Sequence, residues 1–512
     1  MLTCELVQGQ ITFQKIYGGN GSNHCQDIHQ TVDGGYIIAG YTSSFGAGGY
    51  DVYLIKIDSI GDTLWTKTFG GLGDDVGNAV QQTIDGGFII EGSTSSFGGG
   101  EVDVYLIKTD SNGDTLWTKT YGGPVAETGY SAQQTIDGGY IIAGETNSNN
   151  GNNRDVYLVK TDSFGNAIWA KTYDIASDDW GYSVQQTADR GYIITGYTSL
   201  NGNDVLLIKT DSLGEILWSK TYGGSNDDQG CSVKQTTDGG YIVVGYTSSF
   251  GVGLYNVYLI KTTSNGDTLW TKTYGGNSVD FGLSVQQTID GGYIIGGSSQ
   301  SFTTGSIEGA YLIKTNSLGN MQWTKVYGDT VQEVAECVEQ TSDGGYIFGG
   351  HGALGPFNQN WYIVKTDLHG NSGCNEKNVA TIQGSPATQV TIVAPIINSD
   401  NFTHNTQTIL GSGCIVTTLC DNVGINEITV KANNFIFPNP NDGSFTISYH
   451  LSTLKNELLI KDIFSRTVYS FDIRSAEGKH NINISFLSRG IYYWQLISDN
   501  NISSTGKLAI IK

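Results

Sequence analysis

The strongest constraint on this chain is an internal repeat with a period of about 50 residues. Each copy carries the triplet Asp-Gly-Gly, and in one copy Asp-Arg-Gly replaces it. The intervals between successive aspartates are 52, 52, 52, 49, 52 and 53 residues. These aspartates are Asp33, Asp85, Asp137, Asp189, Asp238, Asp290 and Asp343. A large aromatic residue keeps the same interval, at Phe13, Trp65, Trp117, Trp169, Trp218, Trp270 and Trp323. A fixed period of this length indicates stacked copies of one supersecondary unit.

The copy from Gly129 to Tyr173 shows what each unit should form. Four short runs rich in Val, Ile, Tyr, Thr and Trp (GYSAQQT, YIIAGET, DVYLVKTD and AIWAKTY) alternate with turns rich in Asp, Asn, Gly and Ser. This pattern predicts four antiparallel strands joined by hairpins, with no helix between them. Seven such units predict an all-β fold, a seven-bladed β-propeller with four-stranded blades over residues 11–371.

The two ends of the repeat are complementary. Ile11–Tyr17 matches the aromatic-bearing fourth strand, and the seventh copy stops after Asp367 without that strand. We therefore expect the N-terminal strand to complete the last blade, which removes an unpaired sheet edge.

Parts of the repeat are similar to two known propeller families. Tyr293–Gly297 (YIIGG) and Tyr346–Gly350 (YIFGG) resemble kelch repeats, and Val104–Trp117 (VYLIKTDSNGDTLW) resembles the tryptophan-docking repeats of quinoprotein dehydrogenases. The kelch spacing from Tyr to Trp is not kept, and the quinoprotein family usually has eight blades. The resemblance supports the architecture and carries over no activity.

Composition excludes several classes of function. The formal net charge is −22, from 27 basic and 49 acidic residues. A chain this acidic lacks the basic surface that binds nucleic acid or anionic membranes. No apolar run is long enough for a transmembrane helix. The 38% hydrophobic content is sufficient to build a folded core.

Charged residues recur at fixed positions of the repeat. Lysine recurs in the third and fourth predicted strands of every copy, which we interpret as protection of outer strands against edge pairing. An acidic residue recurs at the entry to the first strand, where the innermost strands of a propeller begin. This predicts a ring of carboxylates at one mouth of the channel, either a cation site, a docking rim or a set of turn caps. The ring consists of Asp75, Glu127, Asp179, Asp228, Asp280 and Glu333, with Asn23 in the first copy.

Motifs of common enzymes are missing from the sequence. It contains no HExxH, GxSxG, P-loop or CxxC motif, and its seven histidines are scattered. We predict no catalytic residue, no cofactor and no metal ligand set, with a structural cation such as calcium as the alternative. A pocket in the channel with paired carboxylates and perturbed pKa values would favour an enzyme, either a polysaccharide-active hydrolase or lyase or a quinoprotein-like oxidoreductase.

The tail from Phe435 carries the most specific signal. It reads as about seven short strands, which predicts a small β-sandwich over residues 435–512. Phe435–Tyr449 (FIFPNPNDGSFTISY), Leu487–Leu496 (LSRGIYYWQL) and Gly506–Lys512 (GKLAIIK) resemble the type A C-terminal sorting domain of the Bacteroidota type IX secretion system. The matching motif residues are Pro438, Asn439, Pro440, Gly443, Gly490, Ile491, Tyr492, Tyr493 and Lys507.

This resemblance implies a route out of the cell. Such proteins cross the inner membrane with a signal peptide, cross the outer membrane through the type IX machinery, and remain at the surface or are released. Residues 1–10 lack a basic segment and a full apolar segment, so we expect them to be the remnant of a truncated signal peptide. The expected function is an exported binding module for an extracellular glycan or protein.

Residues 372–434 separate the repeat from the tail. This stretch is rich in Ser, Thr and Asn and holds three of the seven cysteines, Cys374, Cys414 and Cys420. It predicts either a few strands packed on the propeller or a loosely ordered stalk. A disulfide among the three cysteines is plausible in an exported protein.

Overall fold

The computed structural model contains only β-strands as regular elements in the part of the chain that it describes, so the all-β prediction is confirmed. It divides into two units, Met1–Gly424 and Ile425–Lys512. The described residues are 10–147, 153–200, 202–305, 307–328, 331–353, 359–400, 403–405, 409–411, 413–423, 435–437, 444–450, 456–461, 466–473, 477–488, 490–498 and 501–510. The predicted signal-peptide remnant therefore lies outside them except for Gln10.

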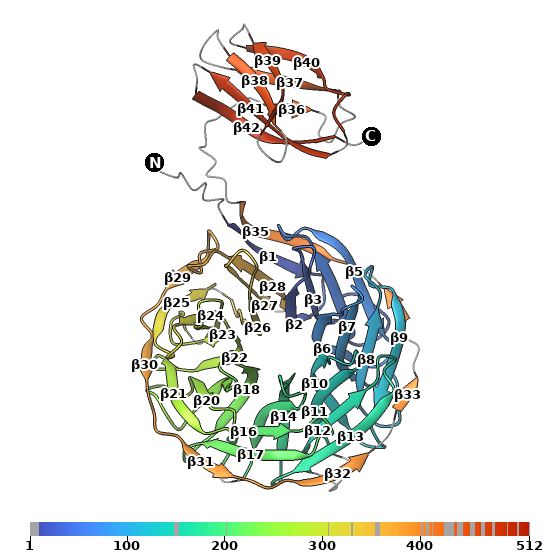
Figure 1. Cartoon of the computed structure of the whole chain (residues 1–512), viewed down its shortest axis with the longest axis vertical. Coiled ribbons are helices and arrows are strands. Elements are labelled where there is room, and N and C mark those ends of the chain that lie inside the picture. The colour runs from blue at the N-terminus through green and yellow to red at the C-terminus, as the bar shows by residue number, and fades with distance from the viewer. Residues whose placement is uncertain are drawn as a thin grey trace. The chain divides into compact units, whose positions relative to one another are not determined.

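Within the described residues of the first unit, seven antiparallel sheets of five strands follow one another around a ring, here called the seven-sheet ring (Figure 1). The first strands lie nearest the centre and contact one another in a closed cycle. They are β2 (Asn23–Gln30), β6 (Asp75–Gln82), β10 (Glu127–Gln134), β14 (Asp179–Gln186), β18 (Asp228–Gln235), β22 (Asp280–Gln287) and β26 (Cys337–Gln340).

The second and third strands form the buried middle of each sheet. The second strands are β3 (Tyr36–Thr42), β7 (Phe88–Thr94), β11 (Tyr140–Thr146), β15 (Tyr192–Thr198), β19 (Tyr241–Thr247), β23 (Tyr293–Ser299) and β27 (Tyr346–Ala353). The third strands are β4 (Asp51–Ile57), β8 (Asp103–Thr109), β12 (Asp155–Thr161), β16 (Asp204–Thr210), β20 (Asn256–Thr262), β24 (Gly309–Thr315) and β28 (Gln359–Thr366).

The fourth strands carry the repeated aromatic residue. They are β5 (Thr63–Gly70), β9 (Thr115–Tyr121), β13 (Ala167–Asp174), β17 (Ile216–Gly223), β21 (Thr268–Gly275), β25 (Met321–Tyr327) and β1 (Ile11–Gly18). The N-terminal β1 pairs with β28 of the last sheet, from Phe13 opposite Lys365 to Tyr17 opposite Trp361. The expected closure of the last sheet by the N-terminal strand is thus observed.

A fifth strand covers the outer edge of every sheet, and all seven come from residues 376–423, here called the belt (Figure 1). The belt runs around the ring against the order of the sheets, from the sixth back to the first and then to the seventh. Its strands are β29 (Glu376–Asn378), β30 (Ile382–Gly384), β31 (Gln389–Ile392), β32 (Ile396–Asp400), β33 (Thr403–Asn405), β34 (Ile409–Gly411) and β35 (Ile415–Val423). The described residues of the stretch between repeat and tail thus lie on the ring, mostly as edge strands.

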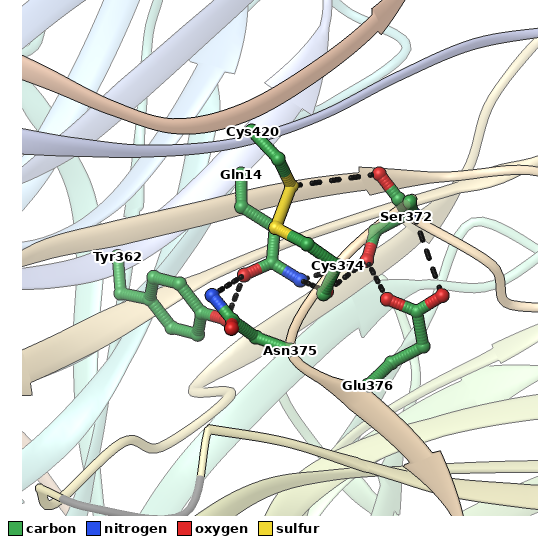
Figure 2. Close-up of a disulfide and its surroundings, with 8 residues drawn as sticks. Gln14, Tyr362, Ser372, Cys374, Asn375, Glu376 and Cys420 are labelled. Atoms are coloured by element: carbon green, nitrogen blue, oxygen red, sulfur yellow. Dashed lines mark hydrogen bonds between the residues drawn. A yellow bond between two sulfur atoms is a disulfide. The ribbon is translucent and has the colours of Figure 1, made fainter.

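A disulfide between Cys374 and Cys420 joins the two ends of the belt beside the last sheet (Figure 2). Gln14 of β1 donates from its amide to Ser372 Oγ at 2.7 Å and to the carbonyl of Cys374. Tyr362 of β28 donates to the amide oxygen of Gln14 at 2.7 Å. One buried glutamine therefore connects the last sheet to the closed end of the belt.

The Asp-Gly-Gly turn explains the strictest part of the repeat. Asp33 accepts hydrogen bonds from the Thr31 hydroxyl at 2.5 Å and the Gly35 amide at 3.0 Å, while Gly34 adopts a φ of +82°. In the variant copy Arg190 takes the same conformation at a φ of +68°, which costs a non-glycine residue roughly 1–2 kcal/mol.

The third-strand lysines correct our edge-protection interpretation. Each is buried and pairs with the partly exposed aspartate of its own turn at 2.8–3.0 Å, so its charge is compensated within its own sheet and it protects no edge. The pairs are Lys56–Asp33, Lys108–Asp85, Lys160–Asp137, Lys209–Asp189, Lys261–Asp238, Lys314–Asp290 and Lys365–Asp343.

Apolar cores lie between neighbouring sheets. Ile37, Leu54 and Phe69 of the first sheet pack with Ile90 and Tyr105 of the second, and every pair of neighbours repeats this arrangement. The repeated tryptophan also packs against the next sheet: the ring centroids of Trp117 in the second sheet and Tyr140 in the third lie 5.9 Å apart. A Cβ on Gly165 would come within 2.6 Å of the Trp117 ring, so the turn beneath it requires glycine.

The second unit has two antiparallel sheets, β36-β37-β40 and β39-β38-β41-β42, in its described part. Both contribute to one core that includes Phe445, Leu458, Ile482, Trp494 and Leu508. The strands are β36 (Phe435–Phe437), β37 (Ser444–His450), β38 (Asn456–Lys461), β39 (Thr467–Ile473), β40 (Glu477–Asn483), β41 (Gly490–Ser498) and β42 (Asn501–Ile510).

Candidate functional site

The first strands surround a polar cavity at the centre of the ring, with a volume of about 240 Å³. Its lining combines serine, glutamine and a few charged side chains from all seven sheets. Pockets for drug-sized ligands usually enclose about 300–1,000 Å³. The interior therefore has room for several water molecules, and a larger ligand must bind at one of its mouths.

A ring of side chains at the seventh position of the first strands ties the sheets together. In four copies this residue is glutamine. Its side-chain oxygen accepts a hydrogen bond of 2.5–2.7 Å from the next sheet, where the donor is the backbone N–H of the last residue of the first strand. These residues are Gln81, Gln133, Gln185 and Gln286. The remaining three positions carry His29, Lys234 and Glu339 instead.

The charged exceptions form a cluster in the cavity. His29 Nε2 lies 3.3 Å from Asp27 Oδ2, and its Nδ1 lies 3.4 Å from Glu339 Oε2. Asp27 also accepts the Val80 N–H at 2.9 Å, and Glu339 accepts the Gln30 N–H at 2.8 Å. The cluster therefore connects three adjacent sheets: an ion pair and a hydrogen bond join β2 to β26, and a hydrogen bond to a backbone N–H joins β2 to β6.

These contacts shift the protonation of the cluster. Burial alone would lower the pKa of His29, but Asp27 and Glu339 raise it well above its usual value. Burial would raise the pKa of Asp27, and His29 outweighs burial and lowers it. Burial lowers the pKa of Lys234 against the attraction of both carboxylates. The two carboxylates thus favour the charged form of His29.

The sequence reasoning missed Asp27, His29, Lys234 and Glu339. His29, Lys234 and Glu339 depart from the repeat at one fixed register, where glutamine is the common residue, and Asp27 departs two positions earlier, where serine is common. The seven histidines are scattered along the sequence, and the fold brings His29 into this cluster. His24 and His351 lie together at the mouth with ring centroids 5.3 Å apart, and burial and His24 lower the pKa of His351 to about 4.

The predicted acidic residues lie at the entry to the first strands, buried among turn groups. Asp75 accepts hydrogen bonds from the Ser96 hydroxyl at 2.7 Å, the Gly71 amide at 2.8 Å and the Thr94 hydroxyl. Glu127, Asp179, Asp228 and Asp280 each accept an equivalent hydrogen bond from a turn amide. The backbone of Glu333 forms an isolated antiparallel β-bridge with Gly352. Burial raises the pKa of Asp75, Asp179, Asp228 and Asp280.

Aromatic side chains gather at the mouth where the first strands begin. The Trp180 group consists of Tyr130, Trp180, Tyr182 and Tyr197. Trp180 and Tyr197 stack at 5.6 Å with an angle of 18°, and all four rings are partly exposed. Arg154 lies 4.3 Å over the Trp180 ring and 3.6 Å from Glu145.

Two further aromatic groups share this mouth. One consists of Tyr246, Tyr255 and Phe281, and the other of His24, Tyr41, Tyr50 and His351. In the first of these, the Tyr246 hydroxyl donates to Gln229 at 2.5 Å. The mouth thus combines flat apolar surfaces with nearby hydrogen-bonding groups, the usual lining of a ligand site.

The sorting-signal residues belong to the second unit. Gly490, Ile491, Tyr492 and Tyr493 begin β41, and Tyr493 lies opposite Lys507 of β42. Tyr492 is buried and its hydroxyl donates to the Ser488 carbonyl at 3.0 Å. Pro438, Asn439, Pro440 and Gly443 lie outside the described residues.

Comparison with family models decides what the tail is. A model described as "Secretion system C-terminal sorting domain" matches residues 435–512. The tail is a sorting domain. A sorting tail implies the type IX secretion machinery and export to the cell surface or beyond it. No helix in the described residues is long and apolar enough to cross a membrane.

Solved structures with a similar arrangement are distant. Sqt1 from Chaetomium thermophilum is 11% identical and has a TM-score of 0.42, over 73% of this chain and 89% of that one. PorZ, a surface component of the type IX secretion system of Porphyromonas gingivalis, is 11% identical with a TM-score of 0.32, over 94% and 58%. A Dyadobacter fermentans protein of unknown function is 10% identical with a TM-score of 0.39, over 71% and 100%.

At these identities and TM-scores the likenesses decide neither fold nor function. A search of curated proteins finds no match.

Proposed function

We propose that this protein is an exported binding module, a seven-bladed β-propeller followed by a sorting domain, which binds an extracellular glycan at its aromatic mouth. We assign residues 11–371 and the belt to the propeller and residues 435–512 to the sorting domain. The closed cycle of first strands and the division of the chain at Gly424 support this assignment. The sorting domain supports a final location at the cell surface or in the medium.

The Trp180 group carries the binding proposal. Partly exposed, nearly parallel aromatic rings offer flat faces to the C–H faces of sugar rings, and Arg154 and Glu145 offer polar groups beside them. Rigid aromatic side chains also lose little conformational freedom on binding. A protein ligand is the other outcome that the test below distinguishes.

The test compares Trp180→Ala with Phe164→Ala in the full chain. Phe164 is 70% exposed and lies in the turn after β12, at the end of the sheet opposite the mouth, because β12 and β14 begin at the same end. Calorimetric titration with surface polysaccharide from the producing cells should show binding that Trp180→Ala weakens at least about tenfold, as expected for a central aromatic anchor. Phe164→Ala should bind like the wild type.

Equal binding by Trp180→Ala and the wild type would overturn the proposed site. Binding to surface proteins in place of polysaccharide, with the same loss in Trp180→Ala, would keep the site and replace the ligand class.

An enzyme on the same scaffold remains the second candidate, and the Asp27–His29–Glu339 cluster favours it. It provides two carboxylates and a histidine in a cavity, with the pKa of His29 raised and that of Asp27 lowered, as a catalytic site would. Against this, both carboxylates also hold backbone amides of neighbouring sheets, so each is engaged in joining sheets. Polysaccharide cleavage that His29→Gln abolishes, with the protein still folded, would replace binding by catalysis.

A further inference from the structure

One copy of the repeat differs from the other six at the end of its fourth strand. Six copies have glycine after the buried aromatic residue, and the third copy has Asp174. The glycines are Gly18, Gly70, Gly122, Gly223, Gly275 and Gly328. At three of these glycines, Gly70, Gly122 and Gly223, two acidic side chains crowd this point: a Cβ on Gly70 would lie 2.2 Å from Asp51 Oδ1 and 2.7 Å from Asp75 Oδ2.

This crowding has a regular origin. One carboxylate comes from the first residue of the third strand, and the other from the first residue of the next sheet. At Gly223 the corresponding distances are 1.9 Å to Asp204 and 2.7 Å to Asp228. In the third copy the equivalent pair is Asp155 and Asp179, so Asp174 adds a third carboxylate to an existing pair.

The three carboxylates converge. One oxygen from each of Asp155, Asp174 and Asp179 lies within 4.8 Å of the other two. Asp155 and Asp179 are completely buried, and neither oxygen of Asp155 has a hydrogen-bond partner. An unpartnered buried carboxylate beside two further carboxylates is costly unless a cation neutralises it. Nearby Arg154 is directed to Glu145 and Trp180.

We propose that Asp155, Asp174 and Asp179 bind one calcium ion at the junction of the third and fourth sheets. Carboxylate oxygens are the ligands of hard divalent cations, and calcium accepts the irregular geometry that three side chains with solvent or backbone oxygens provide. The ion joins β12 and β13 of one sheet to β14 of the next. This site is independent of the glycan proposal, although Asp179 directly precedes Trp180.

The matched variant is Asp174→Gly, which gives the third copy the residue of the other six copies and should fold for that reason. Asp51→Asn serves as the control. It removes one acid from the Asp51–Asp75 pair, which has Gly70 where the third copy has Asp174. The full chain is freed of metal with a chelator and titrated with calcium chloride by calorimetry. Extracellular calcium modules have Kd values of roughly 10⁻⁴–10⁻³ M.

We expect one saturable site per chain in the wild type and in Asp51→Asn, and at least about tenfold weaker binding in Asp174→Gly. Calcium should also raise the Tm of the wild type and of Asp51→Asn, and leave that of Asp174→Gly unchanged. Absence of calcium binding by the wild type at these concentrations would overturn the proposal. Equal binding by Asp174→Gly would also overturn it. If magnesium binds more tightly than calcium, the three aspartates remain the proposed site and magnesium becomes the proposed ion.

Discussion

At the scale of single residues, the repeat assigns a joining role to side chains that face the channel. Each first strand ends in a glutamine. In all seven copies the side-chain oxygen of this glutamine accepts a hydrogen bond of 2.7–3.0 Å from a neighbouring sheet, and the donor is the backbone N–H of the second residue after that sheet's first strand. At the position before it, glutamine gives way to His29, Lys234 and Glu339 in three copies. Charge attraction thus replaces part of a hydrogen-bonded ring.

The raised pKa of His29 predicts a pH-dependent stability. Its charged form is favoured in the folded state, so the ion pairs stabilise the fold fully below the ordinary histidine pKa of about 6.5. This contribution is lost as the pH rises through the raised pKa. Because the His29 side chain is 38% exposed, solvent screening limits the change in Tm to about 1 °C.

The comparison is between the wild type and His29→Gln, which installs the residue found in four copies. Differential scanning calorimetry from about pH 6 to about pH 9 should show the wild type losing Tm relative to the variant. Asp27, Glu339 and Lys234, which surround His29, are the same in both proteins. A Tm difference between the two proteins that stays constant across this pH range would contradict the assignment of the pH dependence to His29.

The sequence predicted residues that obey the repeat better than residues that depart from it. The turn aspartates and the tryptophans can be identified from the sequence because they recur, and they recur because each copy makes the same contact. Asp27, His29 and Asp174 each also face a group of a neighbouring sheet, and those neighbours are seen only when the sheets are placed side by side. The third-strand lysines recur as strictly as the aspartates, but recurrence does not reveal that the two are paired.

At the scale of elements, the belt is the feature that pattern analysis left open between strands and a stalk. Six of its seven strands have only three to five residues, too few for an alternating pattern. Hydroxyl groups of the fourth strands hold it: Thr324 donates to the Val379 carbonyl at 3.0 Å, and Thr66 accepts from the Gly413 amide at 3.0 Å. Short edge strands of this kind also limit pairing with other chains.

The disulfide predicts how firmly the belt is held. Cys374 and Cys420 are 46 residues apart, and closing a loop of that length stabilises the folded state by up to about 4 kcal/mol. Replacing both cysteines with serine should lower the Tm and increase amide hydrogen exchange in residues 376–423, because the belt can then leave the ring from its ends. The inner strands β2, β6 and β10 should exchange as slowly as before.

Cys231→Ser is the control for this experiment, since Cys231 is a free cysteine in the lining of the cavity. It should leave belt exchange unchanged. If the double variant exchanges like the wild type, the edge pairings alone hold the belt and the disulfide adds nothing to its retention.

At the scale of the whole molecule, the two units have separate cores and separate tasks. Phe445, Leu458 and Trp494 belong to the core of the second unit, which contains residues of that unit alone. Among the residues that the structure describes, the cores of the first unit contain none from the second. Since neither core depends on the other, we expect a chain that ends at Gly424 to fold.

Removal of the tail should therefore separate export from stability. In the producing cells, a variant ending at Gly424 should be missing from the surface and the medium, because it lacks the residues that match a secretion-system sorting domain. Its purified first unit should keep the Tm and hydrogen-exchange pattern of the full chain. Cell fractionation with mass spectrometry of the chain ends measures the first outcome, and calorimetry measures the second. Continued export of the variant would remove the sorting role from residues 435–512, whereas a lost thermal transition would show that the ring needs the tail to fold.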